Sequence, residues 1–349
     1  MNESTISVKE AKSPERIGWA DLARGIAILL VIIGHTLEFD DFTSIYIRGM
    51  IFSFHMPLFF ILGAFTYRWA QDKTSLMEKM KRGARHLLIP VLLIWLLQLA
   101  FFWSDQGKSI ELTEYLRDAL KRLLFSSGAS ITHDSETIAP LGMLWFLVVL
   151  FLGRLLYNSV KLLFEEKQQI FISLLLGFLG ILSEALPFSG DIVLAVQPFF
   201  WLGDRMSRSA YWKEKRESRY FIPAFLLWVI TLFAMFPEHL ELATRSYPLF
   251  PLFYLCAAGG SLFLFELCRG LAALPFRIIP LEFIGKYSLY FLIVHSIDTF
   301  FFGSFLWRDE KNFAFSCLFR ILYVTAGALL LILLKMVTGR IGRTLQQKG

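Results

Sequence analysis

The sequence predicts an all-α protein: a polytopic membrane helix bundle of about ten transmembrane helices, with both termini cytoplasmic. Three observations support this prediction, namely the composition, the spacing of the apolar runs and the distribution of charge. Hydrophobic residues make up 56% of the 349 residues and charged residues only 18%, whereas a soluble domain carries about 25% charged residues. The mean hydropathy is +0.55. The composition therefore excludes an ordinary soluble enzyme and places most of the chain in a lipid bilayer.

Ten apolar runs are long enough to be considered as membrane spans, since a helix crosses the hydrocarbon core with about 20 residues. The predicted spans are 17–37, 46–67, 86–103, 141–160, 168–186, 190–203, 220–236, 247–268, 281–302 and 313–336. The sixth is short and contains Pro198, so we expect it to be tilted, broken or re-entrant. Residues 1–16 lack the apolar run and cleavage site of a signal peptide, so the first span should be retained.

The positive charges give an independent test of the span count. Of the 35 Lys and Arg residues, 22 fall on the predicted cytoplasmic side and seven in the outer loops, as the positive-inside rule requires. We therefore expect a cytoplasmic tail at 1–16, a membrane domain at 17–337 and a second cytoplasmic tail at 338–349. The longest outer loop, 104–140, carries leucines at helical spacing over Glu111–Phe125. This pattern predicts an amphipathic helix on the membrane surface, over a cavity, or acting as a plain connector.

Other function classes find no support in the sequence. The net charge of +6 is explained by topology, and no basic patch with interleaved aromatic residues suggests nucleic acid binding. Cys256, Cys268 and Cys317 all lie in apolar runs and lack metal-ligand spacing. We therefore expect no metal site and no disulfide framework.

The first predicted helix carries three ionisable residues in an otherwise apolar stretch: Asp21, Arg24 and His35. Ionisable groups inside a membrane are costly, so each is a candidate functional residue. Arg24 and His35 are 11 residues apart, which on a helix places them on one face about 16 Å apart along the axis. Asp21 lies three residues before Arg24, within reach of an ion pair.

This layout suits a long substrate with a charged end and a reactive end. The forked guanidinium of Arg24 suits phosphate, and the imidazole of His35 suits proton abstraction or acyl transfer near neutral pH. A phosphate-bearing acyl-CoA could place its charged end at Arg24 and its thioester at His35. The alternative is structural: Arg24 extends to the cytoplasmic surface, and His35 caps the outer end of the helix.

Two further histidines lie in the outer halves of predicted spans. His55 is followed by Pro57, which should loosen the helix and free a carbonyl. Arg48 lies seven residues before His55 and on nearly the same face. We predict that His55 and Arg48 help to bind substrate, unless His55 only ties helices together.

The other histidine is His295 in the ninth span. Ser288 lies seven residues earlier on the same face, and Asp298 lies one turn later. Asp298 could orient the imidazole through a hydrogen bond, as carboxylates do for catalytic histidines. The alternative is again a satisfied histidine within a bundle, but three histidines in the outer halves of three spans favour a shared site.

Four segments resemble the acyltransferase-3 family of membrane acyltransferases. The most specific is ADLARGIAILLVIIGHT on the first helix, with Arg24 and His35; the others are FHMPLFFILGAF, LWFLVVLF and IGKYSLYFLIVHSI. The chain is most similar to the fucose 4-O-acetylase-like subgroup. The resemblance spans most of the chain and implies acetyl-CoA as acyl donor, a carbohydrate acceptor and a bacterial cytoplasmic (inner) membrane location.

The resemblance also implies that His35 is the catalytic histidine and Arg24 an essential partner, with Arg24 and Asp21 at the acyl-CoA. His55, His295, Arg48, Ser288 and Asp298 are expected to line the substrate site. It leaves open whether His35 carries the acetyl group or acts as a base, and which sugar hydroxyl is modified. The alternative function is a transporter or flippase of a sugar or lipid-linked sugar, since such proteins also bury polar residues and break their helices.

Overall fold

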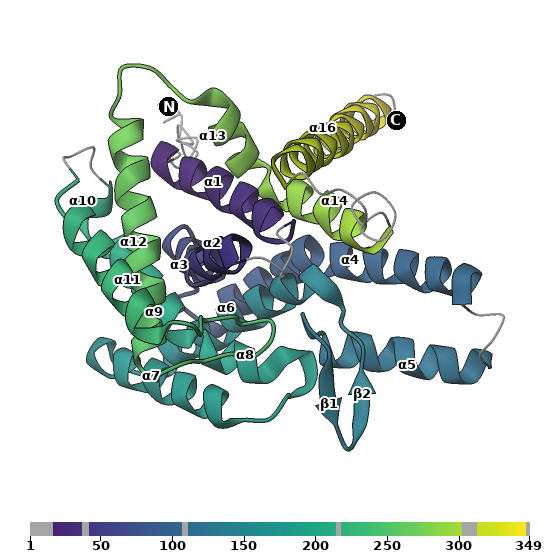
Figure 1. The fold of residues 1–349 in the computed structure, drawn as a ribbon. Helices are drawn as coiled ribbons and strands as arrows, with labels where there is room; N and C mark the ends of the chain where they lie inside the picture. Colours follow the sequence, from purple (N-terminus) through teal and green to yellow (C-terminus); the bar gives the residue numbers. More distant parts are fainter. Residues whose placement is uncertain (1–16, 37–41, 107–110, 214–217, 302–312, 347–349) are drawn as a thin grey trace, which may run out of the picture.

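The computed structural model describes residues 17–36, 42–106, 111–213, 218–301 and 313–346. The predicted tail at 1–16 lies outside this part of the chain. Within it the protein is almost entirely helical (Figure 1), which confirms the all-α prediction. One short antiparallel hairpin, β1 (Ile131–His133) paired with β2 (Glu136–Ile138), is the exception in the described ranges.

The helices follow the predicted apolar runs closely. In chain order they are α1 (Gly18–Gly34), α2 (Phe42–Phe52), α3 (His55–Phe65), α4 (Lys73–Gln106), α5 (Leu112–Phe125), η1 (Gly142–Leu144), α6 (Trp145–Leu163), α7 (Glu166–Leu182), η2 (Pro187–Ser189), α8 (Gly190–Ala195), α9 (Gln197–Arg208), α10 (Ala210–Lys213), α11 (Phe221–Met235), α12 (Leu252–Ala272), α13 (Ile279–Lys286), α14 (Ser288–Phe301) and α16 (Phe313–Gln346). Among the described residues, each predicted span therefore overlaps at least one helix.

Five helical segments in the described ranges are long and apolar enough to cross a membrane. They are Ile45–Phe65, Lys73–Ser104, Gly142–Leu163, Leu252–Ala272 and Ala314–Thr338. The apolar helix Phe221–Met235 is shorter. The protein is thus an integral membrane helix bundle, while the count of ten spans and the cytoplasmic termini remain predictions.

Two of the predicted helices have other limits in the structure. The predicted span 281–302 is interrupted at Tyr287, between α13 and α14, and the predicted span 86–103 is the later part of a helix that begins at Lys73. Helix α16 continues to Gln346, so the predicted tail at 338–349 is helical over most of its length. The sixth predicted span is broken at Val196 into α8 and α9, one of the alternatives that Pro198 suggested.

The second predicted span is also two helices, and its break lies just before His55. Pro57 has no N–H to donate to the carbonyl of Ser53, so the helical ladder cannot continue there. Phe54 accordingly leaves helical geometry, with φ −142° and ψ −18°. The Ser53 hydroxyl donates to the Met50 carbonyl at 2.7 Å and accepts from the Trp228 indole at 2.9 Å. These bonds stabilise the break and place His55 in the first turn of α3.

Helix α1 packs among α2, α3, α12, α13, α14 and α16 (Figure 1). Its closest approach is to α13, where two glycines face backbone atoms. A Cβ on Gly25 would lie 2.1 Å from the Leu281 carbonyl oxygen, and a Cβ on Gly285 only 1.7 Å from that of Asp21. Small residues permit such close helix contacts in membranes. This contact fixes the position of the helix that carries Arg24 and His35.

We therefore expect Gly285→Ala to destabilise the bundle by about 1–3 kcal/mol, the usual range for overpacking. The inserted methyl group must push α13 away from α1 because it meets backbone rather than a flexible side chain. Thermal unfolding in detergent measures the effect. Gly18→Ala is the matched control, since a Cβ there meets no heavy atom within 4 Å. Equal unfolding temperatures for the two variants would contradict the close packing.

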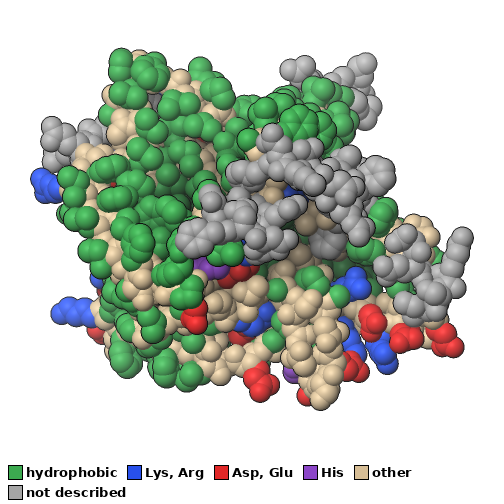
Figure 2. All heavy atoms as spheres, viewed as in Figure 1, with side chains coloured by type: hydrophobic (Ala, Val, Ile, Leu, Met, Phe, Trp, Pro, Cys, Tyr) green, Lys and Arg blue, Asp and Glu red, His purple; other side chains and the backbone are tan. Residues whose placement is uncertain are grey.

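The surface separates apolar from charged regions. Figure 2 shows hydrophobic side chains crowded over the upper left of the view, with most of the charged side chains in its lower part. The predicted helix in the outer loop is α5, which confirms it as a helix. Its Tyr115 hydroxyl donates to the Leu99 carbonyl of α4 at 2.5 Å, and the Trp95 indole of α4 donates to the Ala119 carbonyl at 3.0 Å. Its leucines Leu112, Leu116, Leu120 and Leu124 face away from the protein.

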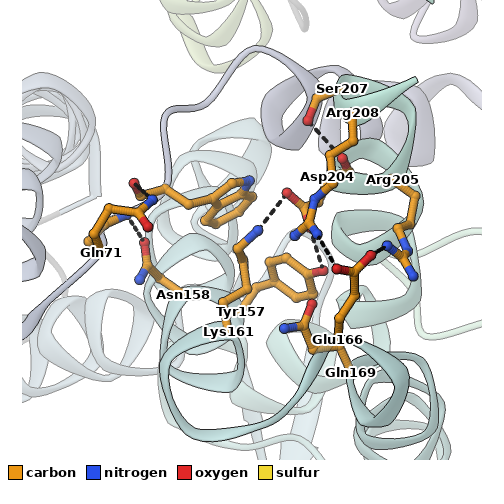
Figure 3. Close-up of polar contacts among 12 residues, drawn as sticks. Gln71, Tyr157, Asn158, Lys161, Glu166, Gln169, Asp204, Arg205, Ser207 and Arg208 are labelled. Carbon is orange, nitrogen blue, oxygen red and sulfur yellow. Dashed lines mark hydrogen bonds and ion pairs between the residues drawn. The ribbon is translucent and has the colours of Figure 1, made fainter. Parts of the chain in front are cut away.

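A buried carboxylate ties α6 to α9 away from α1 (Figure 3). Asp204 accepts hydrogen bonds from the Tyr157 hydroxyl at 3.2 Å, from Lys161 at 2.7 Å and from Arg208 at 2.8 Å. Glu166 at the start of α7 pairs with Arg208 and with Arg205. Because the buried charge has three donors, this cluster is explained by structure alone.

Candidate active site

A cavity of about 420 Å³ runs along one face of α1. From this helix it is lined by Arg24, Ile28, Val31 and His35, whose spacing of four, three and four residues is that of a single helical face. The structure therefore places Arg24 and His35 at the two ends of one cavity. On α1 itself, the two lining residues between them, Ile28 and Val31, are apolar.

At one end of the cavity lies Arg24. Its Nη1 donates to Asp21 Oδ1 at 3.0 Å, the ion pair expected from their spacing, and its Nη2 donates to Thr66 Oγ1 at 2.7 Å. Asp21 itself is buried and is not part of the cavity wall. A second arginine, Arg154 of α6, lines the same end and donates to the Gly63 carbonyl at 3.0 Å. Two guanidinium groups at one cavity end favour a phosphate-bearing ligand.

At the other end lies His35, which follows the last residue of α1 and exposes its side chain to the cavity. The Phe52 ring lies between two histidines, with its centroid 5.5 Å from that of His35 and 4.7 Å from that of His55. The Cζ of Arg48 lies 4.2 Å from the Phe52 centroid. His55 and Arg48 line the cavity as well.

The break before α3 orients His55. Its Nδ1 lies 3.0 Å from the Ile51 carbonyl oxygen. A carbonyl oxygen can only accept a hydrogen bond, so the ring proton is on Nδ1. Nε2 is then the acceptor nitrogen of the neutral ring. Because the carbonyl is one that the interrupted helix leaves without its usual partner, the same local irregularity positions the side chain.

His295 lies directly behind His35, with 5.7 Å between the ring centroids. His295 is fully buried, and neither of its ring nitrogens has a hydrogen-bond partner among the described residues. Asp298 Oδ2 is 3.5 Å from His295 Nδ1. This distance is too long for the hydrogen bond between the two residues that their spacing on one helix suggested. The shorter contact of that oxygen is with Arg320 Nε of α16, at 2.5 Å. The structure therefore brings together the three histidines predicted to share a site.

A family comparison identifies the class of protein. The family model for acyltransferase-3, which is described as an acyltransferase domain, matches residues 17–340 of this chain. The chain belongs to the acyltransferase-3 family. That match includes the whole of the cavity wall.

Curated relatives of this acyltransferase are distant. The nodulation protein NolL of Mesorhizobium japonicum is 36% identical over 109 residues, which cover 28% of this chain and 28% of that protein. NolL of Sinorhizobium fredii is 33% identical over 109 residues, covering 28% of this chain and 30% of that protein. The matched region thus spans less than a third of the curated relatives. No solved structure matches the chain.

At the His35 end, the rim of the acyltransferase cavity carries a second polar group. Arg48 Nη2 donates to Glu241 Oε1 at 3.2 Å, and His239 Nε2 lies 3.7 Å from Glu241 Oε2. Burial opposes ionisation of Glu241, but His239, Arg48 and His55 outweigh it and hold the pKa of this carboxyl below its ordinary value. Glu241 is therefore an ionised acceptor beside a cation, a pair that can bind hydroxyl groups.

Most of the predicted site residues share this one space. Arg24, His35, Arg48, His55 and Ser288 line the cavity, whereas Asp21, His295 and Asp298 lie behind its wall. Sequence reasoning missed Arg154, Glu241 and Arg320. For the two arginines the signal was present, since each is a cation inside a predicted apolar span. In the described ranges, no group of three or more His, Cys, Asp or Glu residues could hold a metal.

Proposed function

We propose that this acyltransferase transfers an acetyl group from acetyl-CoA to a hydroxyl of a carbohydrate, with His35 as the catalytic histidine. The observation that carries the proposal is the single cavity with Arg24 at one end and His35 at the other. The two positions lie about 16 Å apart along the axis of α1. The cavity fits a ligand with an anionic head, a slender arm and a reactive terminus.

The donor would bind with its phosphates at the arginine end. Arg24 and Arg154 supply forked donors suited to phosphate oxygens. The pantetheine arm would extend past Ile28 and Val31, which present no competing charge. The thioester would then reach His35, where the cavity is again polar.

At His35 the hydroxyl oxygen of the acceptor attacks the thioester carbonyl. The C–O ester bond forms, the C–S bond breaks, and the hydroxyl proton passes to the His35 imidazole and on to the departing CoA thiolate. In the covalent variant, a ring nitrogen of His35 attacks the thioester carbonyl, the C–S bond breaks and the departing CoA thiolate takes the ring proton. The acceptor hydroxyl then attacks the acetyl-imidazole, the C–N bond breaks and the hydroxyl proton returns to the freed ring. Trapping and sequencing an acetylated His35 peptide distinguishes the two routes.

The acceptor would enter past the rim that carries Arg48 and Glu241. A neighbouring donor and acceptor suit the adjacent hydroxyls of a sugar, and Phe52 and Trp145 add aromatic surface to the cavity. His55 and Ser288 line the cavity, and we infer that both help to bind substrate, His55 at the end near His35. We infer a surface polysaccharide or lipid-linked sugar precursor as the acceptor, as in the fucose 4-O-acetylase-like subgroup, at a bacterial inner membrane.

The break in the sixth predicted span gives little support to the transporter alternative. A transporter binds its substrate at such breaks, but neither Val196 nor Gln197 lines the cavity. The Gln197 side chain instead donates to the Val193 carbonyl at 2.7 Å. The break therefore brings neither of these residues to the cavity.

Purified protein in nanodiscs, given acetyl-labelled acetyl-CoA and a library of sugar and lipid-linked sugar acceptors, tests the proposal. We expect label to move into an alkali-labile ester, with one CoA released for each ester formed. Binding or movement of acceptor without any use of acetyl-CoA would overturn the proposal and favour the transporter.

A further inference from the structure

Arg320 places a positive charge inside the last apolar helix. It belongs to the apolar segment Ala314–Thr338, whose mean hydropathy reaches 2.3, yet its residue surface is only 4% exposed. A buried charge in an apolar helix persists only when neighbouring groups neutralise it or form hydrogen bonds with it. The groups that bind Arg320 therefore indicate the role of this residue.

Those partners lie on two other helices. Toward α14, Nε donates to Asp298 Oδ2 at 2.5 Å and Nη2 to Thr299 Oγ1 at 3.3 Å. Toward the end of α1, Nη1 donates to the His35 carbonyl oxygen at 2.8 Å and to Thr36 Oγ1 at 3.2 Å. A single guanidinium thus joins three helices at the level of His35.

The contact with His35 has a specific physical consequence. The last carbonyls of a helix have no partner within it, and α1 ends at Gly34, inside the bundle. An arginine at a helix C-terminus satisfies such a carbonyl and interacts favourably with the helix dipole. By holding the backbone of His35 itself, Arg320 limits where the imidazole can lie relative to Phe52 and the cavity.

Asp298 makes this arrangement possible. Asp298 is fully buried and neutralises Arg320. The guanidinium can therefore remain charged inside the bundle and donate hydrogen bonds to the end of α1. Asp298 also lies near His295, the ring behind His35. The carboxylate expected to orient His295 therefore acts mainly on Arg320.

We propose that Arg320 is a positioning residue for the acyl transfer step: held by Asp298, it fixes the end of α1 so that His35 faces the thioester. This inference rests on the proposed function. Arg320 and Asp298 are absent from the cavity wall, so they act through His35 rather than on substrate. Their loss should change the rate of the chemical step and leave donor binding at the Arg24 end intact.

Steady-state CoA release in nanodiscs tests the proposal through the split between kcat and KM. For Arg320→Met we expect kcat to fall about 10–100-fold, the range for residues that orient a reacting group, with KM for acetyl-CoA unchanged within about twofold. Arg320→Lys should recover only part of the rate, because an ammonium lacks the planar fork that holds both helices.

A double variant separates positioning from charge balance. Asp298→Asn with Arg320→Met removes both buried charges, so the unfolding temperature should return toward that of wild type, while kcat stays low. Arg269→Met is the matched control: Arg269 is buried, pairs with Glu266 at 3.2 Å and donates to the Tyr211 carbonyl at 3.0 Å, but is not part of the cavity wall. It should lose stability and keep the wild-type kcat per folded molecule.

The rate at which diethyl pyrocarbonate modifies His35, read by peptide mass spectrometry, gives a measure independent of turnover. We expect this rate to change in Arg320→Met and not in Arg269→Met. A wild-type kcat in folded Arg320→Met, or recovery of both kcat and stability in the double variant, would overturn the positioning role. Wild-type protein that never turns over acetyl-CoA would instead refute the proposed function, and the modification rates would still test the placement of His35.

Discussion

His35→Ala should lower acetyl transfer by about 10²–10⁴-fold, the range for loss of a positioned acid–base group. His35 is the histidine that the cavity reaches at the end of α1, and Phe52 separates it from His55. His295 is buried behind His35 and does not line the cavity, so His295 cannot take over the role of His35. The loss should appear in kcat, with acetyl-CoA binding retained. CoA release at saturating acetyl-CoA measures it.

A second histidine provides the control for this prediction. His133 lies on the short hairpin, partly exposed and away from the cavity wall. His133→Ala should keep wild-type turnover under the same conditions. Full turnover by a well-folded His35→Ala protein would exclude His35 from catalysis and direct attention to His55.

Arg24→Ala should raise the KM for acetyl-CoA about 10–100-fold with a smaller change in kcat. A hydrogen bond to a charged group is worth about 1.5–3 kcal/mol, and Arg24 lies at the end of the cavity remote from the chemistry. Lost binding without lost chemistry is the signature of a group that contacts only the donor head. Initial rates over a range of acetyl-CoA concentrations provide both constants.

Acetyl-pantetheine, which lacks the phosphates of CoA, distinguishes phosphate binding from structural damage. If Arg24 binds phosphate, wild type and Arg24→Ala should use acetyl-pantetheine equally poorly. Arg24 also binds Asp21 and Thr66, so Asp21→Asn is the control for loss of the ion pair alone. An equal loss with acetyl-CoA and acetyl-pantetheine would show that Arg24 supports the fold and not the donor.

The spacing of apolar and ionisable residues was sufficient to predict α1, the helix that lines the candidate active site. An apolar run with Arg24 and His35 at a spacing of 11 residues predicts one shared helical face, and the structure places a cavity along that face. Pro57 indicated the break near His55, because a missing N–H has a local effect. Such features depend on a few neighbouring residues, so sequence patterns can predict them.

Features that depend on helix neighbours were not predictable in the same way. Arg320 was visible as a charge in an apolar run, but its contact with His35 joins residues 285 positions apart. Asp298 was expected to bind His295 from their spacing on one helix, whereas α16 supplies a closer partner. Glu241 lies in the loop between α11 and α12, and only the packing of that loop brings it to Arg48. Periodicity describes the face of a helix but not what lies opposite.

The most direct test of the account is to locate the acyl end of the bound donor. An acetyl-CoA analogue with a diazirine in its acyl group would be bound, irradiated and mapped by peptide mass spectrometry, with excess acetyl-CoA as competitor. We predict competed labelling where the ends of α1 and α2 meet the start of α3, at His35, Phe52 or His55. Competed labelling confined to the Arg24 and Arg154 end, or to helices that do not line the cavity, would contradict the proposed direction of donor binding.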